Sequence, residues 1–306
     1  MEDMTKRGMW IGGAIATVVV VAVIATIVLW PRGSETPAAS PAPSVTPSIT
    51  TSPTPTPTPS PTATGAPENT TDYEAGDLPP ADVFGIHPEL PVDDAPADET
   101  LGLTAHPARA EGAPVFADPL GEPVAWMGDE QRFDGTNVPV VELQDHWARV
   151  LLVGRQAPAG QGDPSQLSGW MRVADLEMTP NTRSVRVDLD ARTIAIETRD
   201  GDDVETKIVG TDFASGTEAT PTPVGRSFIM FEDTVESLAY TRGYPIVYLA
   251  VQSPTLAGFD GQNVAVTAFH YHDVRSGAIS NGCIRVAPET ITALAGLPEG
   301  TPVYIS

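Results

Sequence analysis

The stretch VAVTAFHYHDVRSGAISNGCIRV (residues 264–286) holds the only cysteine of the chain, Cys283. Two of the five histidines, His270 and His272, stand at the end of an apolar run just upstream of it. Continuous apolar runs of this length are typical of buried strands. We therefore expect a strand over Val264–His270 that ends in a histidine, followed by a loop that returns to the cysteine.

A cysteine attacks a carbonyl as its thiolate, and a nearby imidazole can take the thiol proton. His270 and Cys283 are too far apart in sequence to face each other on a helix. A loop through Arg275–Ala278 and a turn at Ser280–Cys283 would bring them together. Gly282 allows close backbone approach, so the amides of Gly282 and Cys283 are candidates to face a developing oxyanion.

Two charged or titratable neighbours leave alternatives open. Arg285 lies on the same side as Cys283 if the segment is extended, and it either holds a substrate carboxylate or pairs with an acidic residue. His272 shares a strand face with His270 and is the alternative base. One cysteine and two histidines could also bind zinc, but no C-x-x-C or H-x-x-x-H spacing supports such a site. We predict a cysteine nucleophile with no metal and no other cofactor.

The rest of the C-terminal half predicts a mainly β fold. From Arg183 onward, alternating strands and an Asp-Gly turn precede a further apolar run at Tyr244–Gln252. Pro288–Leu294 is a short helix candidate, with proline at a first helical position. Between Pro107 and Met178, short apolar runs separated by Gly, Pro and Asp indicate a small all-β unit. These runs are Ala113–Ala117, Pro123–Met127, Val138–Leu143, Trp147–Val153 and Gly169–Val173.

The N-terminal region predicts a membrane anchor. Residues 10–30 are uncharged and almost wholly apolar, and a helix of that length spans about 30 Å, enough to cross a bilayer core. Trp10 and Trp30 stand at its ends, and Lys6 and Arg7 precede it, which favours a cytoplasmic N-terminus. We expect a cytoplasmic tail (1–9), a single transmembrane helix (10–30) and an extracytoplasmic remainder. A cleaved signal peptide is the competing interpretation.

Residues 31–106 have the composition of a disordered linker. Gly33–Pro67 is a Ser/Thr/Pro/Ala tract, in which repeated prolines remove backbone donors and favour an extended spacer. Glu68–His106 is acidic and proline-rich, and we expect it to be mostly disordered, with Val83–Ile86 touching the folded part. The net charge of −23 argues against a nucleic-acid partner, because phosphate binding needs a basic surface.

Three segments resemble a known family. SNGCIR (280–285) is similar to the S-H-G-C-[IV]-R signature of the L,D-transpeptidase (YkuD-like) catalytic domain, and AFH (268–270) resembles its apolar-apolar-His step. TPVG (222–225), followed by Phe228, resembles the family's T-P-x-G-x-F turn with one extra residue. The likeness spans about 183–306. Residues 107–178, in turn, resemble the SH3-like module of membrane-anchored actinobacterial members.

The resemblance implies a small SH3-like barrel (107–180) followed by an L,D-transpeptidase β-sandwich (181–306), held at the cell membrane and facing the wall. It implies that Cys283 attacks the L-centre carbonyl of meso-diaminopimelate in a peptidoglycan tetrapeptide stem and expels D-alanine. The thioester then passes to an amine of a second stem, giving a 3→3 cross-link. Transfer to water would be L,D-carboxypeptidase activity, and carbapenems would acylate the same cysteine.

The resemblance also implies roles for individual residues. His270 would be the general base, and the amides of Gly282 and Cys283 the oxyanion donors. Four further residues are expected to bind or orient substrate: Ser280, Asn281, Arg285 and Tyr271. Asn281 stands where the family usually has histidine, so a non-catalytic wall-binding or scaffold protein with a drifted domain remains the alternative. A redox sensor would lack a second, resolving cysteine.

Overall fold

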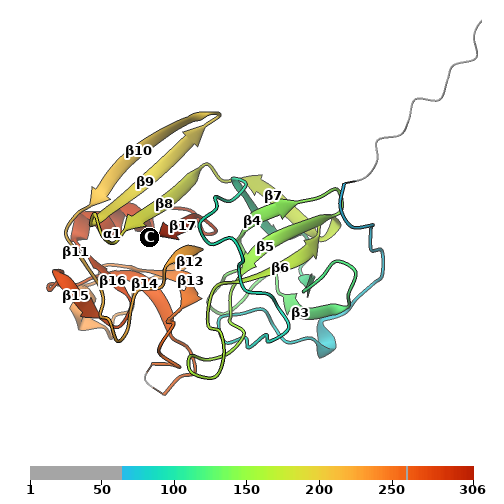
Figure 1. The fold of residues 1–306 in the computed structure, drawn as a ribbon, viewed down its shortest axis with the longest axis horizontal. Helices are drawn as coiled ribbons and strands as arrows, with labels where there is room; N and C mark the ends of the chain where they lie inside the picture. Colours follow the sequence, from blue (N-terminus) through green and yellow to red (C-terminus); the bar gives the residue numbers. More distant parts are fainter. Residues whose placement is uncertain (1–63, 260) are drawn as a thin grey trace, which may run out of the picture. The chain divides into compact units, whose positions relative to one another are not determined.

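A computed structural model of the chain describes residues 64–259 and 261–306, and these residues are mainly β (Figure 1). The first sheet contains β1 (Leu103–Pro107), β2 (Ala113–Phe116), β3 (Pro123–Met127), β4 (Val138–Leu143), β5 (Trp147–Leu152), β6 (Leu167–Arg172) and β7 (Leu176–Pro180). The second contains β8 (Arg183–Asp188), β9 (Thr193–Asp200), β10 (Asp203–Gly210), β11 (Phe213–Gly216), β12 (Gly225–Asp233), β13 (Ile246–Gln252), β14 (Val266–Tyr271), β15 (Gly277–Ser280), β16 (Ile284–Val286) and β17 (Pro302–Ile305). The described helical segments are α1 (Pro288–Ala295) and three short 3₁₀ turns, η1 (Ala75–Asp77), η2 (Val173–Asp175) and η3 (Ala239–Thr241).

The first sheet is antiparallel, in the order β3-β2-β6-β5-β4-β1-β7. Its short apolar runs bury their side chains, and Trp147 is fully buried, with its indole N–H donating to the carbonyl oxygen of Pro67. Trp147 therefore packs in the core of the first sheet. The SH3-like likeness of residues 107–180 and the exact domain boundaries stay predictions.

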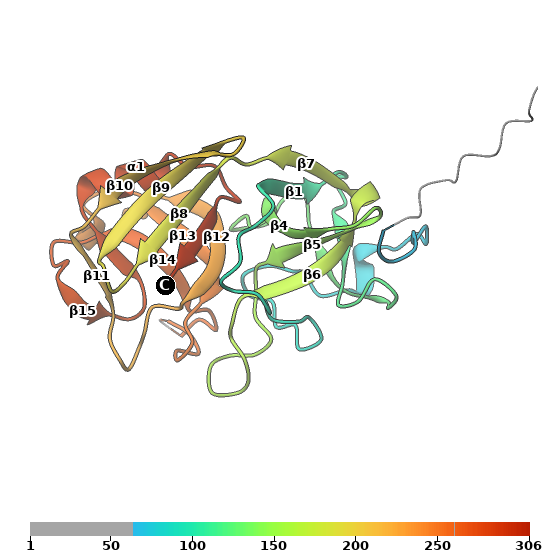
Figure 2. The same cartoon turned by 45° about the horizontal axis from the view of Figure 1, so that its top comes forward.

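The second sheet has the order β10-β9-β8-β17-β12-β13-β14-β16-β11-β15 and mixes parallel and antiparallel pairs. Two of the parallel pairs, β14–β16 and β11–β15, lie at the end that carries the cysteine. α1 packs near β13 and β14, with Ile291 and Leu294 buried in the core of this half. Figure 2 shows β12, β13 and β14 in the middle of this half, between the β8–β10 strands and β15.

One hydrophobic core continues from the first sheet onto the second. Phe228 and Met230 of β12 and Ala250 of β13 pack in the same cluster as the buried residues of β2 to β6. A hydrogen bond also joins the two sheets: the hydroxyl of Ser227 on β12 donates to the side-chain oxygen of Gln166, next to β6, at 2.9 Å. The two sheets are therefore packed against each other as parts of one compact unit.

The segment before β1 differs from the expectation of a disordered linker. Within residues 64–102, Ala81, Val83 and Leu90 are buried in the shared core, and Asp93 forms an ion pair of 2.7 Å with Arg226 of β12. The side chains of this pair are 3% and 2% exposed. An acidic, proline-rich composition predicts disorder only when the segment has nothing to pack against. Here widely spaced apolar residues and one arginine provide the contacts.

The transmembrane anchor expected at residues 10–30, the cytoplasmic tail before it and the proline-rich tract up to residue 63 lie outside the described residues. Among the residues that the structure describes, no helix is long and apolar enough to cross a membrane.

Candidate active site

Strands β14 and β16 bring His270 and Cys283 to one face of the second sheet. The two strands are parallel, and His270 is paired with Arg285. Cα-paired residues point to the same face and side chains alternate along a strand. Cys283, two residues before Arg285, is therefore on the face of His270. Its Sγ lies 4.0 Å from the carbonyl oxygen of Val266, on the strand that carries the histidine.

The His270 ring is oriented by a backbone carbonyl. Its Nδ1 lies 2.9 Å from the carbonyl oxygen of Tyr271. A carbonyl oxygen only accepts, so Nδ1 carries the proton and Nε2 keeps its lone pair. Burial, with smaller contributions from the charges of Arg285 and His272, lowers the pKa of His270 to about 4. At neutral pH the imidazole is uncharged and able to accept a proton at Nε2.

The thiol of Cys283 is also uncharged at rest. Burial raises its pKa, and this effect outweighs the opposing influence of the Ala268 backbone and the positive charge of Arg285. Burial thus disfavours both the thiolate of Cys283 and the imidazolium of His270, so both groups are neutral at rest. In such a pair, the proton moves as the sulfur attacks.

His272 is the poorer base of the two histidines. Its Nδ1 accepts the backbone N–H of Val274 at 2.9 Å, so the proton of the neutral ring is on Nε2. Its ring centroid lies 6.2 Å from that of His270. The lone pair expected of a general base is thus on Nε2 of His270, whereas the lone pair of His272 already accepts the backbone N–H of Val274.

Arg285 and Tyr271 occupy different faces. Arg285 is half-buried on the face of Cys283, its Nε is buried without a hydrogen-bond partner, and no ion pair to it occurs within residues 64–259 and 261–306. Tyr271 belongs to the core on the opposite face, and its hydroxyl donates to Asp273 at 2.5 Å. The expected role of Tyr271 in orienting substrate does not fit this position, because neighbouring strand residues alternate between faces.

The turn before Cys283 is built around the hydroxyl of Ser280. This hydroxyl donates to the carbonyl oxygen of Cys283 at 2.5 Å and accepts the N–H of Gly282 at 3.1 Å. Gly282 has φ +107°, which disfavours any residue with a Cβ. Of the two amides expected to face an oxyanion, that of Gly282 is therefore engaged within the turn. Asn281 is exposed at the turn's outer side.

A second turn, Thr220–Pro223, is hydrogen-bonded to the turn Ser280–Cys283 that contains the nucleophile. Thr222 is 5% exposed; its hydroxyl donates to the carbonyl oxygen of Gly282 at 2.8 Å and accepts the N–H of Gly216 at 2.9 Å. Thr220 donates to the carbonyl oxygen of Ser280 at 3.0 Å. The sequence marks Thr222 only as part of a family turn. Its contact with Gly282 joins segments 60 residues apart and has no local signal.

Replacing Thr222 with valine should slow reactions of the Cys283 thiol by about ten- to a hundredfold, because it leaves buried backbone groups of the turn unpaired. Alkylation of the thiol by iodoacetamide measures this effect without a substrate. Thr222→Ser keeps the hydroxyl and should retain most of the rate. The matched control is Thr290→Val on α1. It removes a similarly buried hydroxyl, which donates to the carbonyl oxygen of Val209 at 2.7 Å. Equal losses in the two valine variants would contradict a specific role for Thr222.

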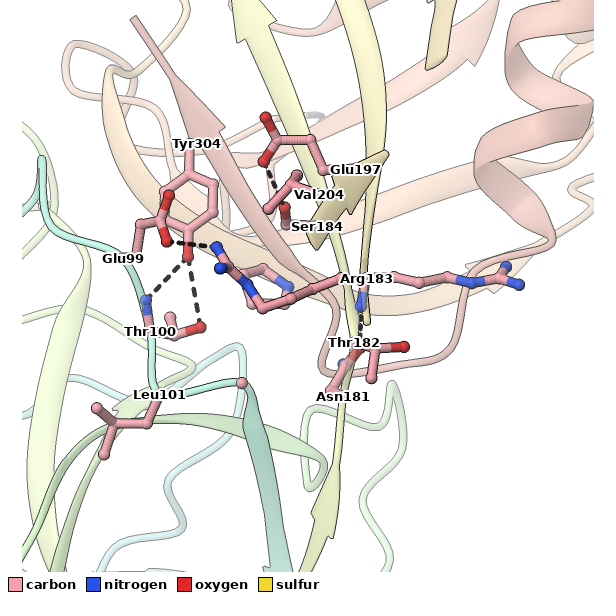
Figure 3. A pocket seen from close by; sticks show the side chains of 13 residues that line it. Glu99, Thr100, Leu101, Asn181, Thr182, Arg183, Ser184, Glu197, Val204 and Tyr304 are labelled. Carbon is pink, nitrogen blue, oxygen red and sulfur yellow. Dashed lines mark hydrogen bonds and ion pairs between the residues drawn. The ribbon is translucent and has the colours of Figure 1, made fainter. Parts of the chain in front are cut away.

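Two cavities differ in their relation to the thiol. One, of about 310 Å³, lies at the junction of the two sheets (Figure 3) and contains no residue of β14 or β16. There the carboxylate of Glu99 forms ion pairs with both Arg186 and Arg199, so these charges neutralise one another within the chain. The other, of about 740 Å³, is lined by Tyr248 and Val266. Val266 lines this cavity, and its carbonyl oxygen lies 4.0 Å from Sγ of Cys283, so the cavity adjoins the strand that contacts the thiol. Burial, with the nearby groups of Tyr240, Asp233 and Cys283, raises the pKa of Tyr248 to about 12.

No group of three His, Cys, Asp or Glu side chains that could hold a metal ion is found in the described part of the chain. Both histidines of the site use Nδ1 for backbone contacts, to Tyr271 and Val274. The chemistry available to these residues is nucleophilic attack by sulfur, assisted by an uncharged imidazole.

Comparisons with known proteins identify a matching family model and similar solved structures. Residues 182–305 match the family model of the L,D-transpeptidase catalytic domain, YkuD. No curated protein matches the chain. Similar solved structures include an L,D-transpeptidase from Mycobacterium smegmatis (13% identity, 53% of this chain and 91% of that chain, TM-score 0.30). The catalytic domain of the E. faecium L,D-transpeptidase is another (22% identity, 40% and 96%, TM-score 0.25). L,D-transpeptidase 3 from Mycobacterium tuberculosis, solved with a faropenem-derived adduct, is a third (13% identity, 58% and 100%, TM-score 0.28). The segment that carries both His270 and Cys283 thus lies within the residues, 182–305, that match the L,D-transpeptidase catalytic domain of the YkuD type.

Proposed function

We propose that this chain is a peptidoglycan L,D-transpeptidase that works through a cysteine thioester. The observation that supports the proposal is the parallel pairing of β14 with β16, in which His270 is paired with Arg285, two residues after Cys283. The family whose catalytic domain residues 182–305 match acts on peptidoglycan stem peptides. A wall-facing membrane protein, anchored by residues 10–30, is part of the same proposal.

In the first step, Sγ of Cys283 bonds to the L-centre carbonyl carbon of meso-diaminopimelate while His270 Nε2 takes the thiol proton. The tetrahedral intermediate collapses, the bond to D-alanine breaks, and the imidazolium returns its proton to the leaving amine. The product of this step is a thioester on Cys283. The backbone amide of Cys283 is the oxyanion donor that the turn leaves available, and Arg285 stabilises negative charge nearby.

In the second step, an amine of another stem attacks the thioester. His270 takes the proton of that amine and returns it to the departing sulfur, so the thiol is restored and a 3→3 cross-link has formed. Water in place of the amine would give a tripeptide, which is L,D-carboxypeptidase activity. A carbapenem would acylate the same sulfur and form an adduct.

Incubation of the full chain with a defined tetrapeptide stem, followed by mass analysis of the products, tests this function. A cross-linked dimer or a tripeptide is the expected result. Unchanged tetrapeptide with a folded, reduced protein would overturn the proposal. Co-sedimentation of that inactive protein with purified sacculi would favour the wall-binding alternative that Asn281 raises.

A further inference from the structure

The cavity lined by Tyr248 and Val266 is shared between the second sheet and earlier parts of the chain. Its volume is about 740 Å³. Phe84 comes from the segment before β1, and Arg132 and Phe133 come from the loop between β3 and β4. Phe231 and Tyr248 come from β12 and β13 of the second sheet. Any molecule that fills this cavity therefore contacts parts of the chain outside the catalytic domain.

Aromatic rings line the cavity in a continuous row. The ring centroids of Phe84 and Phe133 are 5.7 Å apart, those of Phe133 and Phe231 are 5.7 Å apart, and Phe231 stacks on Tyr248 at 4.4 Å. Phe84 is 41% exposed, and the other three rings are half-buried. Aromatic faces offer contact area to aliphatic chains and peptide groups at low entropic cost. The row ends at Tyr248, which lines the cavity together with Val266, the residue whose carbonyl oxygen lies 4.0 Å from Sγ of Cys283.

Arg132 lies over Phe133, the second ring of the row and the neighbour of the exposed Phe84. Its guanidinium carbon lies 4.7 Å from the centroid of Phe133, so the ring supports the charged group. Arg132 is exposed and, within the described ranges 64–259 and 261–306, forms no ion pair. The chain carries 40 acidic residues against 17 Lys and Arg. An arginine that is held by a ring at a cavity and keeps its donors free is suited to bind a carboxylate of a ligand.

The length of the row fits a short peptide. The steps from Arg132 to Phe133, Phe231 and Tyr248 are 4.7, 5.7 and 4.4 Å, so Arg132 lies at most roughly 15 Å from Tyr248. An extended peptide advances about 3.3–3.6 Å per residue. The stretch from Tyr248 to Arg132 therefore accommodates at most about four extended residues, which is the length of a short peptide.

We propose that this aromatic cavity binds the part of the acyl-donor peptide upstream of the attacked carbonyl, and that Arg132 recognises a free carboxylate on that part. The inference rests on the proposed function and extends it. It assigns to residues outside the catalytic domain the choice between stems with a free carboxylate and stems in which that carboxylate is amidated. Asp233, the acidic group lining the same cavity, disfavours a second carboxylate there.

The test compares Arg132→Gln with the unmodified full chain on two tetrapeptide stems, one with free carboxylates and one amidated upstream of diaminopimelate. For the free stem, KM should rise about three- to tenfold with kcat nearly unchanged, because an exposed charge-assisted contact is modest. For the amidated stem, the two proteins should not differ. Arg132→Lys should restore part of the loss. Arg109→Gln, which changes the net charge equally at an exposed site outside the cavity, is the matched control.

Equilibrium binding of both stems to Cys283→Ser protein, with and without Arg132→Gln, gives a second measurement that needs no turnover. If the unmodified chain turns over neither stem, the proposed function fails, and the binding data still decide the role of Arg132. Equal effects of Arg132→Gln on both stems would overturn the inference. Displacement of the peptide by stem-free glycan, with no dependence on amidation, would also overturn it and assign the cavity to sugar.

Discussion

Cys283→Ser is expected to abolish turnover of the tetrapeptide stem, with a loss of about 10⁴-fold or more. A serine hydroxyl is a much weaker acid than a thiol. The base available is an imidazole whose pKa is lowered to about 4, and such a weak base cannot activate the hydroxyl. Product mass analysis measures the loss, and exposure to a carbapenem gives a second signal. The unmodified chain should gain the mass of the drug on Cys283, and the serine variant should not.

A stable fold in the serine variant is the necessary control for that experiment. The side chain is half-buried and similar in size to serine, so the melting temperature should change little. Full activity in a folded Cys283→Ser protein would remove sulfur from the mechanism. A drug adduct on a residue other than Cys283 would have the same meaning, since this is the only cysteine of the chain.

His270→Gln is expected to lower kcat/KM by about 10²- to 10⁴-fold, the usual range for loss of a general base. His272→Gln is the matched control, on the same strand face, and should cost far less because its Nδ1 is already bonded to Val274. Comparable losses in the two variants would mean that the histidines share the role. A large loss in His272→Gln alone would identify His272 as the general base instead.

The dependence of kcat/KM on pH tests the same assignment of His270 as the general base. A general base works in its deprotonated form, and the pKa of His270 is lowered to about 4. The active form should therefore persist well below pH 6.5 and be lost as the pH falls through about 4. Measurement of kcat/KM from pH 3.5 to 8 decides the point. An acid limb near pH 6.5 would indicate an imidazole that is not desolvated.

Much of the strand pattern could be predicted from the sequence. The runs expected at Pro123–Met127 and Val138–Leu143 coincide with β3 and β4, and the helix expected from Pro288 is α1 (Pro288–Ala295). These elements are marked by local signals: apolar runs of strand length and a proline suited to the first helical turn. The catalytic domain fold expected from three short motifs agrees with the family match over residues 182–305.

The features that the sequence did not reveal depend on long-range contacts. Thr222 reaches Gly282, and Arg226 reaches Asp93, across 60 and 133 residues. The neutral state of the thiol and imidazole depends on burial, which motif spacing does not report. For Tyr271, a local signal was misleading. Its position next to His270 in the sequence suggests a shared site, but neighbouring strand residues alternate, so Tyr271 lies on the opposite face.

The buried pair of Asp93 and Arg226 determines where the protein can be cut. A fragment that began at Pro107 would keep the arginine inside the second sheet and discard its only counter-charge in the described chain, at a cost of about 3–5 kcal/mol. It would also uncover the core positions filled by Val83 and Leu90. A preparation intended for crystals or kinetics should therefore retain the segment that contains Val83, Leu90 and Asp93, although this segment has the composition of a tether.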